Sequence, residues 1–412
     1  MGRERPLQDI KVLDLSIYLS GPFLTMLMAG FGAEVIKVER PLLGDPVRMN
    51  LPYAGPDGIT FTRQTAEDMS IGFLKRGRNK KSITLNLRSE KGKNILCELV
   101  KKVDVVTSNF TPGVMDRLGI GYEKLKTINP GIIYCTISGF GNSGPYRELP
   151  AFDLVVQAMS GVMYMTGDPE SPPVKAGIAV SDYCGALSAL SGILIALHYK
   201  KRTGKGQEVD ISMMDALFSF LFDDALDVYG ERGIPVRDGN RTVRLTPFNV
   251  YQTKDGYVAI ATGSDEMWAN LLSAMGMPEL KDDLRYKKLD QRAENVDEVD
   301  ALIKSWTLSK TNNEVVRELR KFRVPCGPVN KANEMCRDPQ LISRGMVKEL
   351  HHPLFGKVEG VCAAGLLIQL SETPGEFTSP APLLGQHNEE IYSNWLGLSR
   401  EELGKLKEEG II

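Results

Sequence analysis

Apolar runs of strand length alternate with helix-length stretches through the first half of the chain. Strands are predicted at residues 10–16, 34–39, 82–87, 104–110, 132–138 and 206–211. Helices are predicted between them, including one over residues 90–102 that begins after a serine cap at Ser89. Because most strand residues are apolar and helices separate the strands, the pattern predicts a parallel, doubly wound sheet covered on both faces. We expect a Rossmann-like α/β large domain.

The pattern changes in a Gly- and Arg-rich stretch near residues 230–244. Residues 247–262 (PFNVYQTKDGYVAIAT) alternate around Lys254-Asp255-Gly256, which is a turn sequence that predicts a β-hairpin. Helical patterns follow, across residues 264–276, 291–308 and 311–321. This block predicts a smaller α+β domain.

Composition narrows the class of protein. The 412 residues are 42% hydrophobic and 25% charged, with a net charge of −2, as in a globular protein of two or three domains. Charges of both signs are interspersed, which argues against nucleic acid and anionic membranes as partners. The N-terminus lacks an apolar signal region, and the apolar run 184–199 is short for a membrane span. We expect a cytoplasmic protein with a buried helix at this run.

Cysteine and histidine usage offers little for metal chemistry. The six cysteines form no C-x-x-C pair, so reduced thiols are expected. The four histidines show no zinc-ligand spacing, and no metal site is predicted.

The β-α-β opening raises the possibility of a dinucleotide-binding dehydrogenase. Glu39 ends the second strand, where an acidic residue grips a ribose in such enzymes. However, no G-x-G-x-x-G follows the first strand, and Gly30-Phe31-Gly32 comes after the helix instead. The sequence therefore favours the fold without the nicotinamide cofactor.

Several basic residues fall at predicted strand ends or in the loops after them. Solvated surface charge explains most such residues, but dispersed cations there also suit a polyphosphate such as that of coenzyme A. The residues are Arg40, Arg78, Lys80, Lys81, Arg88, Arg117 and Arg147.

Asp182 opens the long apolar run SDYCGALSALSGILIALHYKK, at residues 181–201. An aspartate in this place is either a helix cap or a nucleophile. Its neighbours are small (Gly177, Ser181, Cys184 and Gly185), which leaves room for a substrate. A helix N-terminus stabilises the anion, and a carboxyl with an ordinary pKa of about 3.9 is ionised at neutral pH. Such a carboxylate attacks an activated acyl group without a general base.

Ordered segments along essentially the whole chain resemble the class III coenzyme A transferases, the CaiB/BaiF family that includes formyl-CoA transferase and carnitine CoA-transferase. Each segment alone is weak, and their number and order carry the resemblance. They include VLDLS before Gly21-Pro22, GAEVIKVERP at 32–41, NKKSITLNL at 79–87, NFTPGVMDRLG at 109–119, GFGNSGPYR at 139–147, FDLVVQAMSG at 152–161, MTGDPESPPVKAGIAVSD at 165–182, KRTGKGQEVDISMMDA at 201–216, DPQLISRGM at 338–346 and PAPLLGQHNEEI at 380–391.

The resemblance implies an activity and a site. Asp182 matches the family's catalytic aspartate, which attacks an acyl-CoA thioester and passes through an aspartyl–acyl anhydride and an aspartyl-CoA thioester. CoA and acyl-CoA are then substrates, and no cofactor is permanently bound. The positions implied to contact CoA are Tyr18, Leu19, Arg40, Leu85, Arg88, Asn109, Phe110, Arg117 and Arg147. Arg88 and Arg147 replace lysines of formyl-CoA transferase.

The resemblance also implies an assembly, an interlocked homodimer of two ring-like chains. In this arrangement residues 1–220 form a large CoA-binding domain that carries the catalytic aspartate. Residues 221–330 form the small domain with its linkers, and residues 331–412 return to the large domain. None of this follows from the hydrophobic pattern.

Three other functions remain open. Acyl-CoA racemases of the same superfamily have a histidine immediately before the position of Asp153, where this chain has Phe152. Without that histidine one of the two groups that flank the α-carbon is missing, so transferase is favoured. An inactive CoA-binding protein would be expected to lose Asp182 or its small neighbours, and neither is lost. A dehydrogenase is the third alternative.

The substrate is less constrained than the reaction. Leu19 stands where formyl-CoA transferase has glutamine, and that enzyme's glycine-run loop is absent between residues 230 and 262, which argues against formyl-CoA and oxalate. A dicarboxylyl donor such as succinyl-CoA is the hypothesis. Arg241 and Arg244 are candidates for holding its second carboxylate, with a plain surface position as the alternative.

Overall fold

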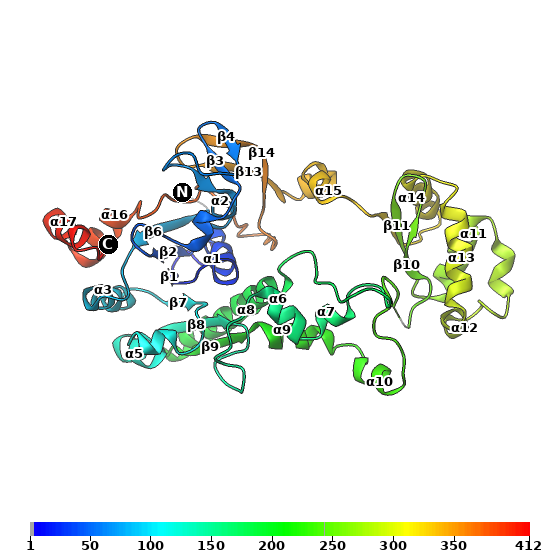
Figure 1. The fold of residues 1–412 in the computed structure, drawn as a ribbon, viewed down its shortest axis with the longest axis horizontal. Coiled ribbons are helices and arrows are strands. Elements are labelled where there is room, and N and C mark those ends of the chain that lie inside the picture. Colours follow the sequence, from blue (N-terminus) through cyan, green and yellow to red (C-terminus); the bar gives the residue numbers. More distant parts are fainter. Residues whose placement is uncertain (1–3, 243) are drawn as a thin grey trace. The chain divides into compact units, whose positions relative to one another are not determined.

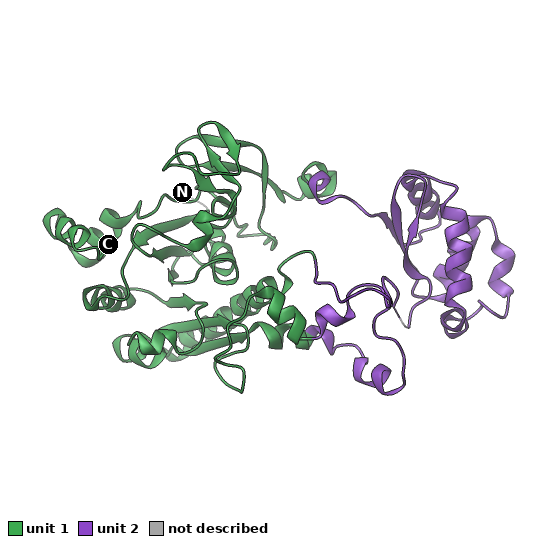
Figure 2. Cartoon of the chain, in the orientation of Figure 1, with its two compact units in different colours: residues 1–160, 177–219, 336–412 green, residues 161–176, 220–335 purple. Residues whose placement is uncertain are grey.

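The computed structural model describes residues 4–242 and 244–412 and divides them into two compact units (Figures 1 and 2). Unit 1 holds Met1–Ser160, Gly177–Ser219 and Cys336–Ile412, and unit 2 holds Gly161–Ala176 and Phe220–Met335. The chain therefore crosses between the units four times, because the short stretch 161–176 groups with unit 2.

A six-stranded parallel sheet forms the centre of unit 1, which confirms the predicted α/β fold class. Its spatial order is β6-β2-β1-β7-β8-β9. Counted along the chain this is 3-2-1-4-5-6, the order of a dinucleotide-binding Rossmann sheet. The strands are β1 (Lys11–Asp14), β2 (Glu34–Glu39), β6 (Lys80–Thr84), β7 (Val105–Ser108), β8 (Ile133–Ser138) and β9 (Glu208–Ser212).

Helices cover both faces of this sheet, as its apolar strands require. Alternate strand residues point to opposite faces, and Leu13, Ile36 and Tyr134 pack in one core cluster with residues of α3 and α5. On the other face α8 contacts β8 and β9 and packs against α1. The helices of unit 1 include α1 (Ser20–Gly30), α3 (Glu90–Val100), α4 (Val114–Arg117), α5 (Tyr122–Ile128), α6 (Asp153–Met159), α8 (Val180–Thr203) and most of α9 (Met213–Leu221), whose last two residues belong to unit 2.

Ser89 occupies the N-cap position of α3, as predicted, but its side chain makes no capping hydrogen bond. Buried ion pairs join strands of the sheet. Lys80 on β6 reaches Asp14 on β1 at 3.0 Å. Burial acts most strongly on the pKa of Asp14 and raises it, but the charges of Lys80 and Lys37 outweigh burial and leave that pKa lowered. Asp14 is therefore an ionised structural group beneath the first loop.

The C-terminal helices complete unit 1 beside its edge strand β6 (Figure 1). These are α16 (Asn388–Leu396) and α17 (Arg400–Glu408). Asn388 accepts from the backbone N–H of Thr84 at 2.8 Å, and the hydroxyl of Tyr392 donates to the carbonyl of Thr84 at 2.7 Å. These bonds cover an edge that would otherwise be open for pairing.

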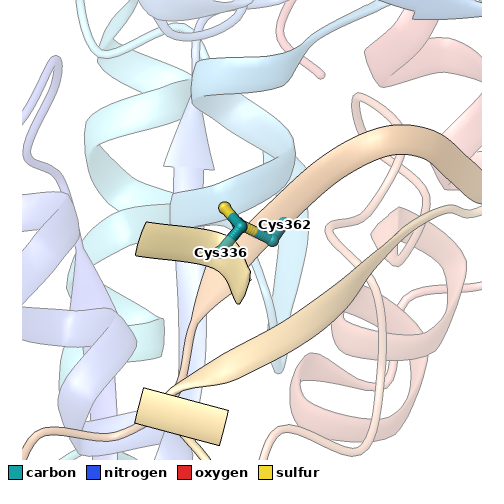
Figure 3. Close-up of a disulfide and its surroundings, with 2 residues drawn as sticks. All are labelled: Cys336 and Cys362. Carbon is teal, nitrogen blue, oxygen red and sulfur yellow. A yellow bond between two sulfur atoms is a disulfide. The ribbon is translucent and has the colours of Figure 1, made fainter. Parts of the chain in front are cut away.

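Short antiparallel strands form two accessory sheets of unit 1, around the helix α2 (Ile71–Arg76). They are β3 (Tyr53–Gly55), β4 (Gly58–Thr60), β5 (Met69–Ser70), β13 (Val347–His352) and β14 (Gly356–Ala364). Cys362 on β14 forms a disulfide with Cys336 (Figure 3). The expectation of six reduced thiols is therefore wrong for this pair, which geometry joins across 26 residues of sequence. Cys97, Cys135, Cys184 and Cys326 are free.

Unit 2 has its own apolar core, around Trp268 and Leu272. The predicted hairpin is present as β10 (Phe248–Gln252) and β11 (Tyr257–Ala261), and β12 (Cys326–Pro328) extends it to a three-stranded antiparallel sheet. The helices that pack on it include α11 (Asp265–Met275), α13 (Val296–Thr307) and α14 (Asn312–Lys321). Shorter helices of this unit are α7 (Val162–Met165), α10 (Leu226–Glu231) and α12 (Leu289–Glu294).

Among the described residues, α8 is the one helix whose length and apolar composition would suffice to cross a bilayer. Its packing against α1, β8 and β9 is that of a core helix in a globular unit, and core helices meet the same criteria. The helix gives only weak support for a membrane span.

Candidate functional site

The carboxyl ends of β1 and β7 lie next to each other at the point where the strand order reverses. Ligands of open α/β sheets bind at this position, because the loops of the two neighbouring strands leave in opposite directions. Asn109, which follows β7, ties these loops together. Its side chain accepts from the Ile17 N–H at 2.8 Å and donates to the Ile17 carbonyl at 2.7 Å.

Tyr18 follows Ile17 with a φ of 65°, a left-handed conformation that is rare for a bulky residue. Its backbone N–H donates to Asp45 at 3.1 Å, and Lys37 holds the other oxygen of Asp45 at 2.8 Å. Asn109 and Asp45 thus fix the loop from both sides. Backbone strain held in this way often marks a functional site.

A cavity of about 1500 Å³ opens beside this loop and lies entirely within unit 1. Six of the nine residues predicted to contact CoA line it, namely Tyr18, Arg40, Leu85, Arg88, Phe110 and Arg117. The structure therefore brings these residues together from four separate stretches of sequence. The three arginines are exposed, as a polyphosphate site requires.

The other three predicted contacts do not line the cavity. Asn109 holds the Tyr18 loop through Ile17, so its place is in support of the site. Leu19 is the N-cap residue of α1. Arg147 is exposed and lies 3.6 Å from Glu148 in an ion pair. A distal strand-end loop carries Arg147, and the resemblance had grouped it with the other cations.

Sequence reasoning missed two exposed cations at the cavity. Arg400 and Lys407 line it from α17. They lie more than 280 residues from Arg117 along the chain. Their shared face of α17, seven residues apart, is the signal that was available.

Asp182 is the third residue of α8 and not its cap. The N-cap residue, Ala179, has no side chain that can serve. Asp153 on α6 supplies the cap instead, and its Oδ1 accepts from the Ser181 N–H at 3.0 Å and from the Ser181 Oγ–H at 2.8 Å. Of the two alternatives for Asp182, cap or nucleophile, the cap is disfavoured, because the carboxylate of Asp153 caps the helix.

The surroundings of Asp182 raise its pKa to about 6. Burial is the largest cause, and the negative charge of Asp153 adds to it, while hydrogen bonds from the Ser20 side chain and backbone and the charge of Arg76 oppose it. The sequence predicted the reverse, an anion stabilised by the helix N-terminus. At pH 7 a group with this pKa is still about nine-tenths ionised. The carboxylate is thus available but less stabilised than an exposed one.

The small residues around Asp182 have separate reasons to be small. A Cβ on Gly185 would come within 3.0 Å of Met213 and 3.3 Å of Ile137, so Gly185 allows α8 to approach the sheet. The Ser181 hydroxyl donates a hydrogen bond to the capping carboxylate of Asp153. Of the four residues predicted to leave room for a substrate, Gly177 faces open space. Cys184 is a free thiol whose pKa is raised by burial and by Asp153.

Glu39 is fully committed within the protein. Arg48 pairs with both of its oxygens, at 2.7 and 2.8 Å, and the Ser82 hydroxyl donates to it at 2.7 Å. The residue is buried, so a cofactor ribose finds no free acceptor there. The described residues hold no cluster of three or more His, Cys, Asp or Glu side chains that would suit a metal ion.

Arg241 and Arg244 belong to unit 2 and have acidic partners of their own. Arg241 lies 2.8 Å from both Asp297 and Asp300, and Arg244 lies 3.2 Å from Asp224. Charges neutralised in this way are poor candidates for a second substrate carboxylate.

Comparison with known proteins gives one family for nearly the whole chain. The model of CoA-transferase family III matches residues 7–388. The succinyl-CoA:D-citramalate CoA-transferase of Chloroflexus aurantiacus is 38% identical over 410 residues, which cover 99% of this chain and 98% of the relative. The human succinyl-CoA:glutarate CoA-transferase is 32% identical over 413 residues, covering 100% of this chain and 91% of the relative.

A solved structure shares the fold across the chain. The crystal structure of a CaiB/BaiF family protein from Brucella suis superposes with a TM-score of 0.81 at 34% sequence identity. The match covers 95% of this chain and 100% of that one.

Proposed function

Given that the chain belongs to CoA-transferase family III, we propose that it moves CoA from an acyl-CoA donor to a carboxylic acid with Asp182 as the nucleophile. The observation that carries the proposal is the placement of Asp182. Its carboxylate stands in the first turn of α8, relieved of capping by Asp153, and it contacts Ser20 two residues after the cavity loop at Tyr18.

Four displacements at carbonyl carbon complete the exchange. An Asp182 oxygen attacks the thioester carbon, the C–S bond breaks, and CoA thiolate leaves an aspartyl–acyl anhydride. The thiolate attacks the aspartyl carbon, releases the donor acid as a carboxylate and forms aspartyl-CoA. The acceptor carboxylate attacks this thioester and expels the thiolate again, giving a second anhydride. The thiolate then attacks the acceptor carbon and regenerates Asp182. Each step trades one anion for another, so no net proton, metal or redox group is needed.

The chain's own residues account for the placement of CoA in this proposal. Arg40, Arg88 and Arg117 would hold its phosphates at the cavity, and Lys407 would add charge from α17, where Arg400 already pairs with Glu389 at 2.6 Å. Tyr18 would guide the thioester arm from the cavity toward Ser20 and Asp182. The Ser20 backbone N–H, which reaches Asp182, stands at the N-terminus of α1 and favours negative charge there.

Dicarboxylic substrates are the class that we propose. The named relatives act on succinyl-CoA with D-citramalate or glutarate, and the chain covers nearly the whole of each relative. Leu19 and the region between residues 230 and 262 also depart from formyl-CoA transferase, as noted above.

Racemisation is the second candidate, and the position before Asp153 argues against it. Phe152 is 68% exposed and packs edge-on against Tyr18, with ring centroids 5.7 Å apart. It has no group that could move a proton, so a racemase would lack one of its two partners. The binding-only alternative is disfavoured because Asp182 is in place. The dehydrogenase alternative lacks a free acceptor at Glu39.

We also propose a cytoplasmic homodimer of the interlocked kind. Large apolar side chains are exposed on the outer side of α8 and α6, which a second copy would cover. They include Leu154, Val155, Leu187, Leu194 and Ile195.

A panel of acyl-CoA donors and carboxylic acceptors, analysed by mass spectrometry, tests the activity. Asp182→Ala should abolish CoA exchange, and hydroxylamine should convert Asp182 to a hydroxamate in the wild type alone. Cys184→Ala is the matched control, since it removes the neighbouring nucleophile and should retain transfer. Exchange that survives in Asp182→Ala, or hydrolysis without transfer to any acceptor, would overturn the proposal. α-Proton exchange from solvent deuterium would favour the racemase.

A further inference from the structure

Three ion pairs hold buried charges of unit 1 beneath the site. Lys37 pairs with Asp45, Arg48 with Glu39 and Lys80 with Asp14, all at 3.0 Å or less. Burying a charge is costly unless a partner is close, so these pairs are the expected arrangement.

Arg76, the last residue of α2, is half-buried and has no acidic partner within ion-pair distance among the described residues. Its Nε atom is buried and has no hydrogen-bond partner among the residues that the structure describes. Burial lowers its pKa, while Tyr183, Asp45 and Asp182 act in the opposite direction. Of the two acids, Asp45 already has Lys37 as its partner. Asp182 is the remaining acid, and its own pKa is raised despite Arg76.

Arg76 and Asp182 therefore interact electrostatically without forming a direct ion pair. Gly72 leaves space for the guanidinium, since a Cβ there would lie 3.1 Å from the nearer Nη atom of Arg76. An apolar wall stands next to Asp182, where Phe23 of α1 packs edge-on against Tyr183 of α8 with ring centroids 4.9 Å apart. The charge of Arg76 acts on Asp182, and the Phe23–Tyr183 pair lies next to Asp182 in sequence. A cation, an apolar pair and a nucleophile related in this way suit a short chain with an acyl group at one end and an anion at the other.

We propose that Arg76 binds the free carboxylate of a dicarboxylic substrate while the other end of that substrate reacts at Asp182. This inference rests on the proposed function and specifies its substrate class. The guanidinium supplies two parallel donors to a carboxylate, and Nε is one of the atoms that such a pair uses. A bound carboxylate would satisfy the orphaned Nε, and the methylene carbons would lie along Phe23 and Tyr183.

A pair of donors of equal carbon number isolates this contact. Succinyl-CoA carries the free carboxylate and butyryl-CoA lacks it. CoA release in the presence of hydroxylamine reports acylation of Asp182 for each donor. Arg76→Gln should lower kcat/KM for succinyl-CoA by about 10- to 100-fold, the range expected for a lost hydrogen bond to a charged group, and should leave butyryl-CoA within about threefold. Arg76→Lys should recover part of the loss, because a point charge replaces the fork.

Lys75→Gln removes the neighbouring cation of α2 and should leave the ratio of the two donors unchanged. An equal fall for both donors in Arg76→Gln would overturn the inference, as would a wild type that prefers butyryl-CoA. The inference would also be overturned if the preference for succinyl-CoA over butyryl-CoA were abolished by Arg241→Gln or Arg244→Gln and not by Arg76→Gln. Hydroxamate on Asp182 with butyryl-CoA would show that the proposed function survives such a failure, whereas its absence with every donor would refute the proposed function itself.

Discussion

Asp153 caps a helix to which it does not belong, by accepting hydrogen bonds from the backbone N–H and the hydroxyl of Ser181 at 3.0 and 2.8 Å. The residue after Ser181 is Asp182. The Asp153 carboxylate thus accepts hydrogen bonds from the N-terminal turn of α8, while its negative charge raises the pKa of Asp182. The relationship joins local stability to the chemistry proposed for Asp182.

Two substitutions of Asp153 should separate these effects. Asp153→Ala removes the cap and should lower the free energy of unfolding by about 1–2 kcal/mol, whereas Asp153→Asn keeps an acceptor oxygen and should lose less. Both remove the negative charge, so both should lower the pKa of Asp182. Denaturant unfolding and the pH dependence of acylation measure the two effects. A pH profile that is unchanged in Asp153→Asn would show that the charge is screened.

Acylation by an acyl-CoA donor should depend on pH through Asp182. Only the ionised carboxylate is nucleophilic, and the pKa is about 6. The rate should therefore be nearly constant above pH 7 and fall about tenfold for each pH unit well below 6. Single-turnover CoA release between pH 4.5 and 8.5 checks this, with circular dichroism to confirm folding at each pH. A midpoint near 4 would mean that Asp182 is solvated in the protein.

The same pKa makes Asp182 a cost to stability at neutral pH. A carboxyl whose pKa rises on folding, here from 3.8 to about 6, binds its proton more tightly in the folded state. Folding is therefore penalised as pH rises through this window, and the penalty is complete above it. Two pKa units correspond to at most about 3 kcal/mol. Asp182→Asn should raise the Tm at pH 8 and leave it almost unchanged at pH 4, by calorimetry. A stabilisation that is equal at both pH values would contradict the linkage.

The sheet could be predicted because its signal is local. Each strand is a short apolar run between helices, and the hairpin around Asp255-Gly256 has its own turn sequence. The strand order is set by packing between distant segments, and the periodicity of the chain does not contain it. The Cys336–Cys362 disulfide was missed for the same reason, because β14 and the segment before α15 (Pro339–Ser343) meet only in three dimensions.

The site was predictable where a residue type states its chemistry. Asp182 and three arginines of the cavity, Arg40, Arg88 and Arg117, were named from sequence, whereas Asp153 was noticed only as the neighbour of a missing histidine. Its capping role depends on the approach of α6 to α8. Arg76 gave no signal, since a buried Nε atom without a hydrogen-bond partner is visible only when its surroundings are known. The direction of the Asp182 pKa shift was wrong because burial outweighed the helix N-terminus.

Two arginines that the family resemblance treats alike should behave differently. Arg117 lines the cavity, and Arg147 pairs with Glu148 outside the lining. Arg117→Ala should raise the KM for acyl-CoA about 10-fold or more, because a charged hydrogen bond to phosphate is lost. Arg147→Ala should change it less than about twofold. Steady-state kinetics at two salt concentrations checks both, since phosphate contacts weaken with salt. Equal effects would place Arg147 at the CoA site after all.

The exposed side of α8 should carry the proposed dimer. Leu187, Leu194 and Ile195 follow helical spacing, and Ile195 is 68% exposed. Light scattering should give twice the 45.5 kDa of one chain for the wild type. Ile195→Asp places a charge in the buried contact and should prevent assembly. Leu284→Asp is the control, at an apolar residue of unit 2 that is 76% exposed, and should leave the dimer intact. A monomeric wild type would refute the dimer, and a dimeric Ile195→Asp would move the interface away from α8.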